Sequence, residues 1–142
     1  MTDLRDQVEA WIADDVDDRA AAELQDLLDA GDVAELADRF AGSLTFGTAG
    51  LRGPMRPGPN GMNRTVVRRA AAGIASWLGV HAPPASCVVV GYDARHGSRD
   101  FAHDSAAILA ADGFEASVLP RPLPTPVLAF AVQRLEIGRA HV

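Results

Sequence analysis

Residues 86–98, which read SCVVVGYDARHGS, contain the pattern that decides the fold class. The apolar run from Ser86 to Tyr92 is typical of a strand buried on both faces, as in sheets that helices cover on both sides. A turn with charged residues follows the run, and Ser98 is a suitable N-cap for a helix that begins after the turn. Functional side chains concentrate at such strand ends in α/β proteins. This stretch therefore predicts an α/β domain with a candidate site at residues 91–98.

Strand and helix patterns also alternate on either side of this stretch. The expected elements, in chain order, are a strand at 44–46, a helix from Asn63 to Gly79, the strand at 86–92, a helix from Ser98 to Asp112, a strand at 114–119 and a helix at 127–135. Asn63 has the side chain of an N-cap, and glycine is common where helices end. The order predicts an α/β fold in which helices lie on the faces of a mixed sheet.

The first forty residues have a different character from the rest of the chain. They hold thirteen acidic residues and three arginines, whereas the remainder holds six acidic residues and ten arginines. Apolar residues recur at helical spacing, with breaks at 17–18 and 31–32, so we expect two or three short amphipathic helices. We interpret residues 1–40 as an acidic helical N-terminal extension that packs on the α/β domain and exposes its acidic face to solvent.

The composition restricts the class of protein. A hydrophobic content of 48% over 142 residues suffices for the core of one domain. The sequence has no apolar run long enough for a membrane span and no N-terminal signal pattern, so a cytoplasmic location without a membrane partner is expected. The single cysteine, Cys87, cannot form an internal disulfide and fits a small buried apolar residue. No dense basic stripe with interleaved aromatic residues exists, and no nucleic-acid partner is expected.

Residues 47–53, GTAGLRG, form a glycine-rich loop with the parts of a phosphate site. The glycines allow close backbone approach, Thr48 offers a hydroxyl, and Arg52 offers a planar fork of N–H donors. The alternative is a structural turn with an exposed arginine, which is the more common case for an isolated loop of this kind. The loop is neither a Walker motif nor a dinucleotide fingerprint, so neither nucleotide site is expected.

Residues 91–98 offer a second group of polar side chains. Asp93 and Arg95 could contact a ligand or form an ion pair that fixes the loop, and both alternatives are open at this point. Ser98 is expected to cap the following helix, because no neighbouring base would activate it as a nucleophile. His96 fits a surface histidine.

Three segments together resemble the first domain of the α-D-phosphohexomutase family, which includes phosphoglucomutases and phosphomannomutases. They are FGTAGLRG at 46–53, GYDAR at 91–95 followed by Ser98, and LPRPLPTP at 119–126. The resemblance extends from about Trp11 to Leu135. It implies a four-domain enzyme in which a phosphoserine gives its phosphoryl group to a phosphosugar and a hexose 1,6-bisphosphate intermediate reorients, with one Mg2+ assisting.

The resemblance also implies a role for each matching residue. Arg52 would face the phosphoserine and the bisphosphate, with Thr48 and Gly50 in the turn that presents it. Asp93 and Arg95 would support the site together with Ser98. The catalytic serine loop, the aspartate loop for Mg2+ and the sugar-selecting loop of the family are absent from this sequence. The chain by itself is therefore expected to be inactive, without a catalytic residue or metal ligand of its own, and glucose, mannose, glucosamine and pentose phosphates all stay open as substrates.

The resemblance gives the expected domain organisation. Residues 1–40 would be the extension, residues 41–135 an incomplete phosphohexomutase domain I, and residues 136–142 a non-native tail. The tail EIGRAHV is what a common sequencing-adapter stretch, GAGATCGGAAGAGCACACGTC, encodes, so we interpret it as a read-through artefact. The main alternative function is a free-standing α/β module that binds a phosphorylated ligand without turning it over. A scaffold that binds no ligand would leave the Arg52 loop without a purpose.

Overall fold

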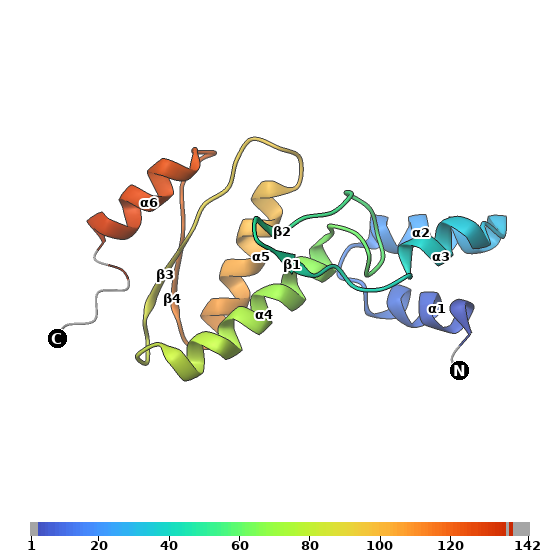
Figure 1. Cartoon of the computed structure of the whole chain (residues 1–142), viewed down its shortest axis with the longest axis horizontal. Helices are drawn as coiled ribbons and strands as arrows, with labels where there is room; N and C mark the ends of the chain where they lie inside the picture. The colour runs from blue at the N-terminus through green and yellow to red at the C-terminus, as the bar shows by residue number, and fades with distance from the viewer. Residues whose placement is uncertain (1–2, 136, 138–142) are drawn as a thin grey trace. The chain divides into compact units, whose positions relative to one another are not determined.

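A computed structural model describes residues 3–135 and 137 of the chain (Figure 1). The chain divides into two compact units, residues 1–66 and 67–142, and each is treated by itself below. The expectation for the tail at 136–142 lies outside the described residues apart from Ile137. Within the described part of the chain, no helix combines the length and the apolar character needed to cross a membrane.

The first unit begins with three short helices: α1 (Leu4–Asp14), α2 (Asp18–Ala30) and α3 (Val33–Arg39). The predicted breaks are confirmed. Asp17 caps α2 by accepting hydrogen bonds from the backbone N–H groups of its first turn, and Gly31 ends α2 in the left-handed conformation with φ of 68°. Asp32 then caps α3 through the backbone N–H of Glu35. Local capping chemistry therefore sets both ends of α2 and the start of α3.

The three helices enclose an apolar core. It consists of Val8, Trp11, Leu24 and Leu36, and Phe40 and Val66 pack against it from later in the chain. The Trp11 and Phe40 rings meet edge to face, with centroids 6.1 Å apart. The same unit contains the antiparallel pair β1 (Phe46–Gly47) and β2 (Gly50–Leu51) and the loop at 54–63. The helices of the extension thus share one compact unit with the glycine-rich loop.

The second unit is built on the parallel strands β3 (Cys87–Val90) and β4 (Glu115–Val118), which pair Cys87 with Glu115 and Val90 with Val118. Helix α5 (Ser98–Ala111) contacts both strands, and α6 (Thr125–Arg134) contacts β3. In Figure 1 the strands lie between these two helices. Buried Ala75 from helix α4 (Arg64–His81) joins Leu109 and Phe114 in the core of the unit.

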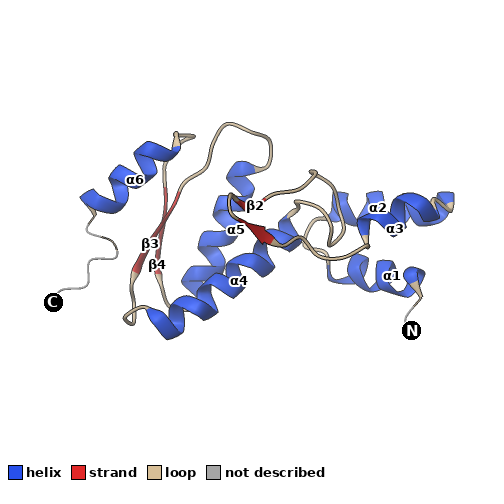
Figure 2. Cartoon of the chain, in the orientation of Figure 1, coloured by secondary structure: helices blue, strands red, loops and turns tan. Residues whose placement is uncertain are grey.

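The α/β class predicted from the sequence is confirmed, and the helical extension precedes it as expected. Parallel and antiparallel pairing both occur, but in two separate two-stranded sheets within the described residues (Figure 2). Asn63 caps α4 as predicted, because its Oδ1 accepts a hydrogen bond from Val66 N at 2.9 Å. The prediction that Gly79 ends this helix is wrong. Gly79 does not take a left-handed conformation, and a glycine inside a helix costs only about 1 kcal/mol, so α4 continues to His81.

The prediction that the strand at 86–92 is buried on both faces is also wrong. All four residues of β3 are half-buried, including Cys87. Among the described residues β3 pairs with one strand, β4, so its other edge lacks the neighbouring side chains of a central strand. The strand is therefore more apolar than its half-buried position in this two-stranded sheet requires.

Candidate functional site

The glycine-rich segment forms a hairpin with a two-residue turn. Phe46 pairs with Leu51 and Gly47 with Gly50, which leaves Thr48 and Ala49 as the turn residues. Gly50 has φ of 92°, a conformation that side-chain-bearing residues rarely adopt. The turn is exposed, so the Thr48 hydroxyl and the backbone of Gly50 face solvent.

Arg52 directly follows β2 and is exposed. Within the described ranges its guanidinium forms no hydrogen bond or ion pair, whereas Arg5, Arg39 and Arg56 of the same unit each pair with an acidic side chain. All its N–H donors are therefore available to an anion, and a guanidinium can bind two phosphate oxygens at once. The hairpin and Arg52 together expose the hydroxyl, backbone and guanidinium groups from which the sequence predicted a phosphate site.

Two backbone hydrogen bonds, one on the side of each arm, hold the base of this hairpin to the loop at 54–63. The backbone N–H of Leu44 donates to the carbonyl oxygen of Pro59 over 3.0 Å, and Met62 N–H donates to Pro54 O over 2.7 Å. A Cβ atom added to Gly53 would lie 2.8 Å from the Leu44 side chain, so the arms pass each other in direct contact. The base of the hairpin is therefore held by the loop at 54–63.

In the second unit, Asp93 binds the rest of the strand-end loop. Its Oδ1 accepts hydrogen bonds from the Arg95 backbone N–H at 3.0 Å and from the Ser98 hydroxyl at 2.7 Å. Its Oδ2 lies 2.7 Å from Arg95 Nε. The Ser98 hydroxyl, the Arg95 backbone N–H and the Arg95 guanidinium all lower the pKa of Asp93 below its ordinary value. Asp93, Arg95 and Ser98 thus form one bonded group.

The prediction that Ser98 caps α5 is wrong. Gly97 occupies the N-cap position in the left-handed conformation, with φ of 77°, and Ser98 is the first helical residue. The Ser98 hydroxyl turns to the Asp93 carboxylate, where a charge-assisted hydrogen bond is stronger than a bond to a backbone N–H. His96 is exposed on the same loop.

An open cavity of about 620 Å³ lies beside this group. Its walls come from the end of β3 and the loop after it, the first two turns of α5, and the first turn of α6 with the two residues before it. The lining residues are Val90, Gly91, Tyr92, Asp93, Arg95, Ser98, Phe101, Ala102, Ser105, Leu123, Pro124, Thr125, Pro126 and Leu128. The sequence alone did not single out Tyr92, Ser105 or Thr125. The hydroxyl groups of these three residues lie beside apolar side chains, a combination that suits an organic ligand with both polar and apolar groups.

The residues described here do not fit a Mg2+ site. Magnesium prefers several oxygen ligands in near-octahedral geometry. Across residues 3–135 and 137, no three His, Cys, Asp or Glu side chains gather closely enough to hold a metal ion. Asp93, the acidic residue of the cavity, already binds Arg95 and Ser98.

We expect the strand-end loop to loosen at acid pH. Because the pKa of folded Asp93 is lowered, its bonds stabilise the loop fully above the ordinary carboxyl pKa of 3.8 and are lost as pH falls through the lower folded value. The Asp93 carboxyl carbon, followed by NMR, should therefore titrate below 3.8, and the Arg95 amide should exchange faster over the same range. Ser98→Ala should move the midpoint upward. An unchanged midpoint in Ser98→Ala would contradict the assigned cause.

Comparison with known proteins gives matches to one family. Residues 43–141 match the family model described as phosphoglucomutase/phosphomannomutase, alpha/beta/alpha domain I. The phosphoribomutase of Saccharomyces cerevisiae is 35% identical over 138 residues, which cover 95% of this chain and 22% of that protein. A probable phosphomannomutase of Haemophilus influenzae is 51% identical over 74 residues, which cover 51% of this chain and 15% of that protein.

A phosphoglucomutase of Staphylococcus saprophyticus is 39% identical over 99 residues, which cover 70% of this chain and 18% of that protein. The chain thus spans between 15% and 22% of the length of these three relatives. No solved structure is matched by the chain. The resemblance read from the sequence is confirmed, and the chain belongs to the phosphoglucomutase/phosphomannomutase family, of which it carries the α/β/α domain I.

Proposed function

We propose that the chain is the phosphate-contacting first domain of a phosphosugar mutase that interconverts hexose 1-phosphate and hexose 6-phosphate. The reaction would run through a phosphoserine and a hexose 1,6-bisphosphate. The observation that carries the proposal is the exposed Arg52 beside a glycine turn, without a protein partner among the described residues. The names of the relatives, which act on phosphorylated sugars, support the same substrate class.

Arg52 would act through its geometry and its charge. Phosphoryl transfer is catalysed mainly by positioning and by neutralising charge on the phosphoryl oxygens. The Arg52 fork can donate two parallel hydrogen bonds to those oxygens, and the Thr48 hydroxyl, exposed in the same hairpin, can donate a third. Gly50 lets the turn backbone approach the phosphate closely.

The group around Asp93 would have a supporting role in this scheme. Asp93 orients Arg95 and Ser98 at the rim of the cavity, and their mutual bonds hold the strand-end loop in one shape. The nucleophilic serine and the Mg2+ ligands would come from other parts of a longer polypeptide, since the described residues do not fit a Mg2+ site. When bound there, Mg2+ would neutralise phosphoryl charge. We place the enzyme in the cytoplasm, without a nucleic-acid or membrane partner.

The chain alone is expected to show no mutase activity, because positioning cannot replace a missing nucleophile. Purified chain should not convert glucose 1-phosphate to glucose 6-phosphate above background in a coupled dehydrogenase assay with Mg2+. The complete polypeptide encoded at the same locus is the positive control. Turnover by the chain alone would overturn the assignment of the serine to another part of the protein.

A second candidate is a module that binds a phosphorylated ligand without catalysis. It is favoured by the cavity of the second unit, which is lined by hydrogen-bond donors while the Ser98 hydroxyl is already bound to Asp93. Calorimetric titration of the chain with glucose 1,6-bisphosphate, beside an Arg52→Ala control, measures binding. Activity of the complete polypeptide, tested with glucose, mannose, glucosamine and ribose phosphates, separates the two functions and identifies the sugar.

A further inference from the structure

The loop that follows the Arg52 hairpin is seated on the end of helix α3. Pro57, Gly58 and Gly61 of this loop are buried. A Cβ atom added to Gly58 would lie 3.1 Å from the carbonyl oxygen of Arg39, and one added to Gly61 would lie 2.3 Å from that of Arg56. The backbone therefore approaches both the helix and itself more closely than a larger residue would allow. Such a loop has little room to shift.

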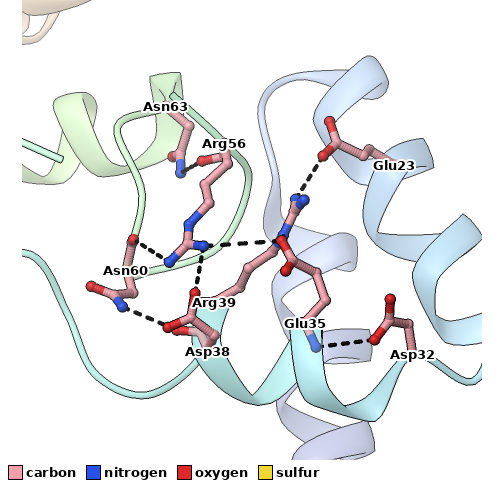
Figure 3. A network of polar contacts seen from close by, with 8 residues as sticks. All are labelled: Glu23, Asp32, Glu35, Asp38, Arg39, Arg56, Asn60 and Asn63. Carbon is pink, nitrogen blue, oxygen red and sulfur yellow. Dashed lines mark hydrogen bonds and ion pairs between the residues drawn. The ribbon is translucent and has the colours of Figure 1, made fainter. Parts of the chain in front are cut away.

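Arg56 connects this loop to the acidic side chains of α3 (Figure 3). Its Nη1 lies 2.6 Å from Asp38 Oδ2 and 4.0 Å from Glu35 Oε1, and its Nη2 donates to Asn60 O at 3.4 Å. Its Nε is buried without a hydrogen-bond partner among the described residues. The side chain thus binds α3 at one end and its own loop at the other.

Glu35 extends the network to helix α2. Arg39, which is 8% exposed, donates from Nε to Glu35 Oε1 at 2.9 Å and from Nη1 to Glu23 Oε1 at 2.7 Å. Burial acts to lower the pKa of Arg39, but the hydrogen bonds to Glu23 and Glu35 outweigh burial and raise it. Arg39 therefore stays charged and keeps Glu35 in place for Arg56.

Two asparagines complete the attachment of the loop. Asn60 donates from its backbone N–H to Arg39 O and from its side chain to Asp38 O, each over 3.0 Å, at the carbonyl end of α3. The side-chain amide of Asn63 faces three carbonyl oxygens of the loop, including that of Gly58 at 2.8 Å. These bonds fix the loop from both ends.

The loop in turn holds the two arms of the hairpin. Leu44 before β1 is bonded to Pro59, and Pro54 after β2 is bonded to Met62. The hairpin tip is exposed, and no hydrogen bond to another part of the first unit is formed by Thr48, Gly50 or Arg52 in the described chain. The direction of Arg52 therefore depends on the loop, and the loop depends on α3.

We infer that Arg56 is a positioning residue for the Arg52 hairpin, with Glu35 and Asp38 of the acidic helices as its counterions. The catalytic consequence rests on the proposed function, whereas the positioning itself does not. Asp38 is 59% exposed, so its ion pair with Arg56 adds little to global stability. Loss of Arg56 should consequently change the hairpin more than it changes the fold.

The test compares Arg56→Met with Arg5→Met in the whole chain. Both variants remove an arginine from an ion pair, but Arg5 pairs with Glu9 on the exposed face of α1. Amide hydrogen exchange at Leu44 and Met62 reports the two bonds at the base of the hairpin. We expect exchange there to accelerate about tenfold or more in Arg56→Met and to stay unchanged in Arg5→Met, while amides inside α2 keep their protection in both.

A conservative variant separates the positioning of the hairpin by Arg56 from a general effect of Arg56 on the stability of the fold. Arg56→Lys keeps the charge for Asp38 but loses the donor to Asn60, so protection at Leu44 and Met62 should be partly restored. Equal protection of these amides in wild type and Arg56→Met would overturn the inference. If Arg56→Met fails to fold, Asp38→Asn decides in its place: faster exchange at the two amides supports the inference, and unchanged exchange overturns it.

A ligand-binding measurement distinguishes failure of this inference from failure of the proposed function. Glucose 1,6-bisphosphate should shift the side-chain Nε resonance of Arg52 in wild type, and the shift should be smaller in Arg56→Met at the same concentration. No shift in wild type would count against the proposed function, while the exchange result would still decide the role of Arg56. An equal shift in both proteins would overturn the positioning role.

Discussion

Arg52→Lys is expected to lower kcat of the complete mutase, in which this chain would be the first domain, about tenfold to a thousandfold. Lysine keeps the positive charge but loses the planar fork that holds two phosphoryl oxygens. Arg52 is exposed and makes no ion pair within the described residues, so the substitution should leave the fold intact. Steady-state kinetics with glucose 1-phosphate and glucose 1,6-bisphosphate, together with a urea unfolding curve, measure both effects.

Arg95→Lys is the matched comparison, because the two arginines differ in their partners. The Arg95 side chain is 85% exposed and binds Asp93 through Nε at 2.7 Å, so it holds the strand-end loop. Its replacement should produce a modest kinetic defect and a local loosening of residues 91–98. Near-normal turnover in Arg52→Lys beside a collapse in Arg95→Lys would mean that the two roles are reversed.

Leu24→Ala should destabilise the first unit by about 2–5 kcal/mol, because Leu24 is completely buried among Val8, Trp11 and Leu36. Typical domains unfold at a cost of about 5–15 kcal/mol, so the loss is a large fraction of the total. Urea unfolding followed by Trp11 fluorescence measures it, in a Trp77→Phe background that removes the exposed tryptophan of the second unit.

Val33→Ala is the control for this substitution. Val33 stands on helix α3 but is 65% exposed, so its truncation leaves no cavity and should change stability by less than about 0.5 kcal/mol. Equal losses in the two variants would contradict the assignment of the core. A large loss confined to Leu24→Ala would also mean that the acidic helices support the unit that contains the Arg52 hairpin.

Much of the fold could be predicted because its signals are local. Gly31 takes the left-handed conformation that ends α2, Asp32 caps α3, and Asn63 caps α4 through a backbone N–H three residues away. Each of these effects involves atoms within a few residues of one another, so the residue type and its place in the apolar pattern suffice. The glycine turn with Arg52 belongs to the same group, since its chemistry is contained in seven consecutive residues.

The amino-acid sequence by itself thus determined the α/β class, the breaks between the first three helices and the family, and it predicted which residues would offer a phosphate site. Only the tertiary structure decided how those residues are held. A serine hydroxyl can cap a helix or bind a carboxylate. Ser98 binds Asp93 because the left-handed Gly97 is the N-cap, so that the helix begins one residue earlier than predicted. Arg56 reaches Asp38, eighteen residues away, because α3 and the loop at 54–63 pack together. Contacts between distant segments depend on packing, which local residue patterns do not specify.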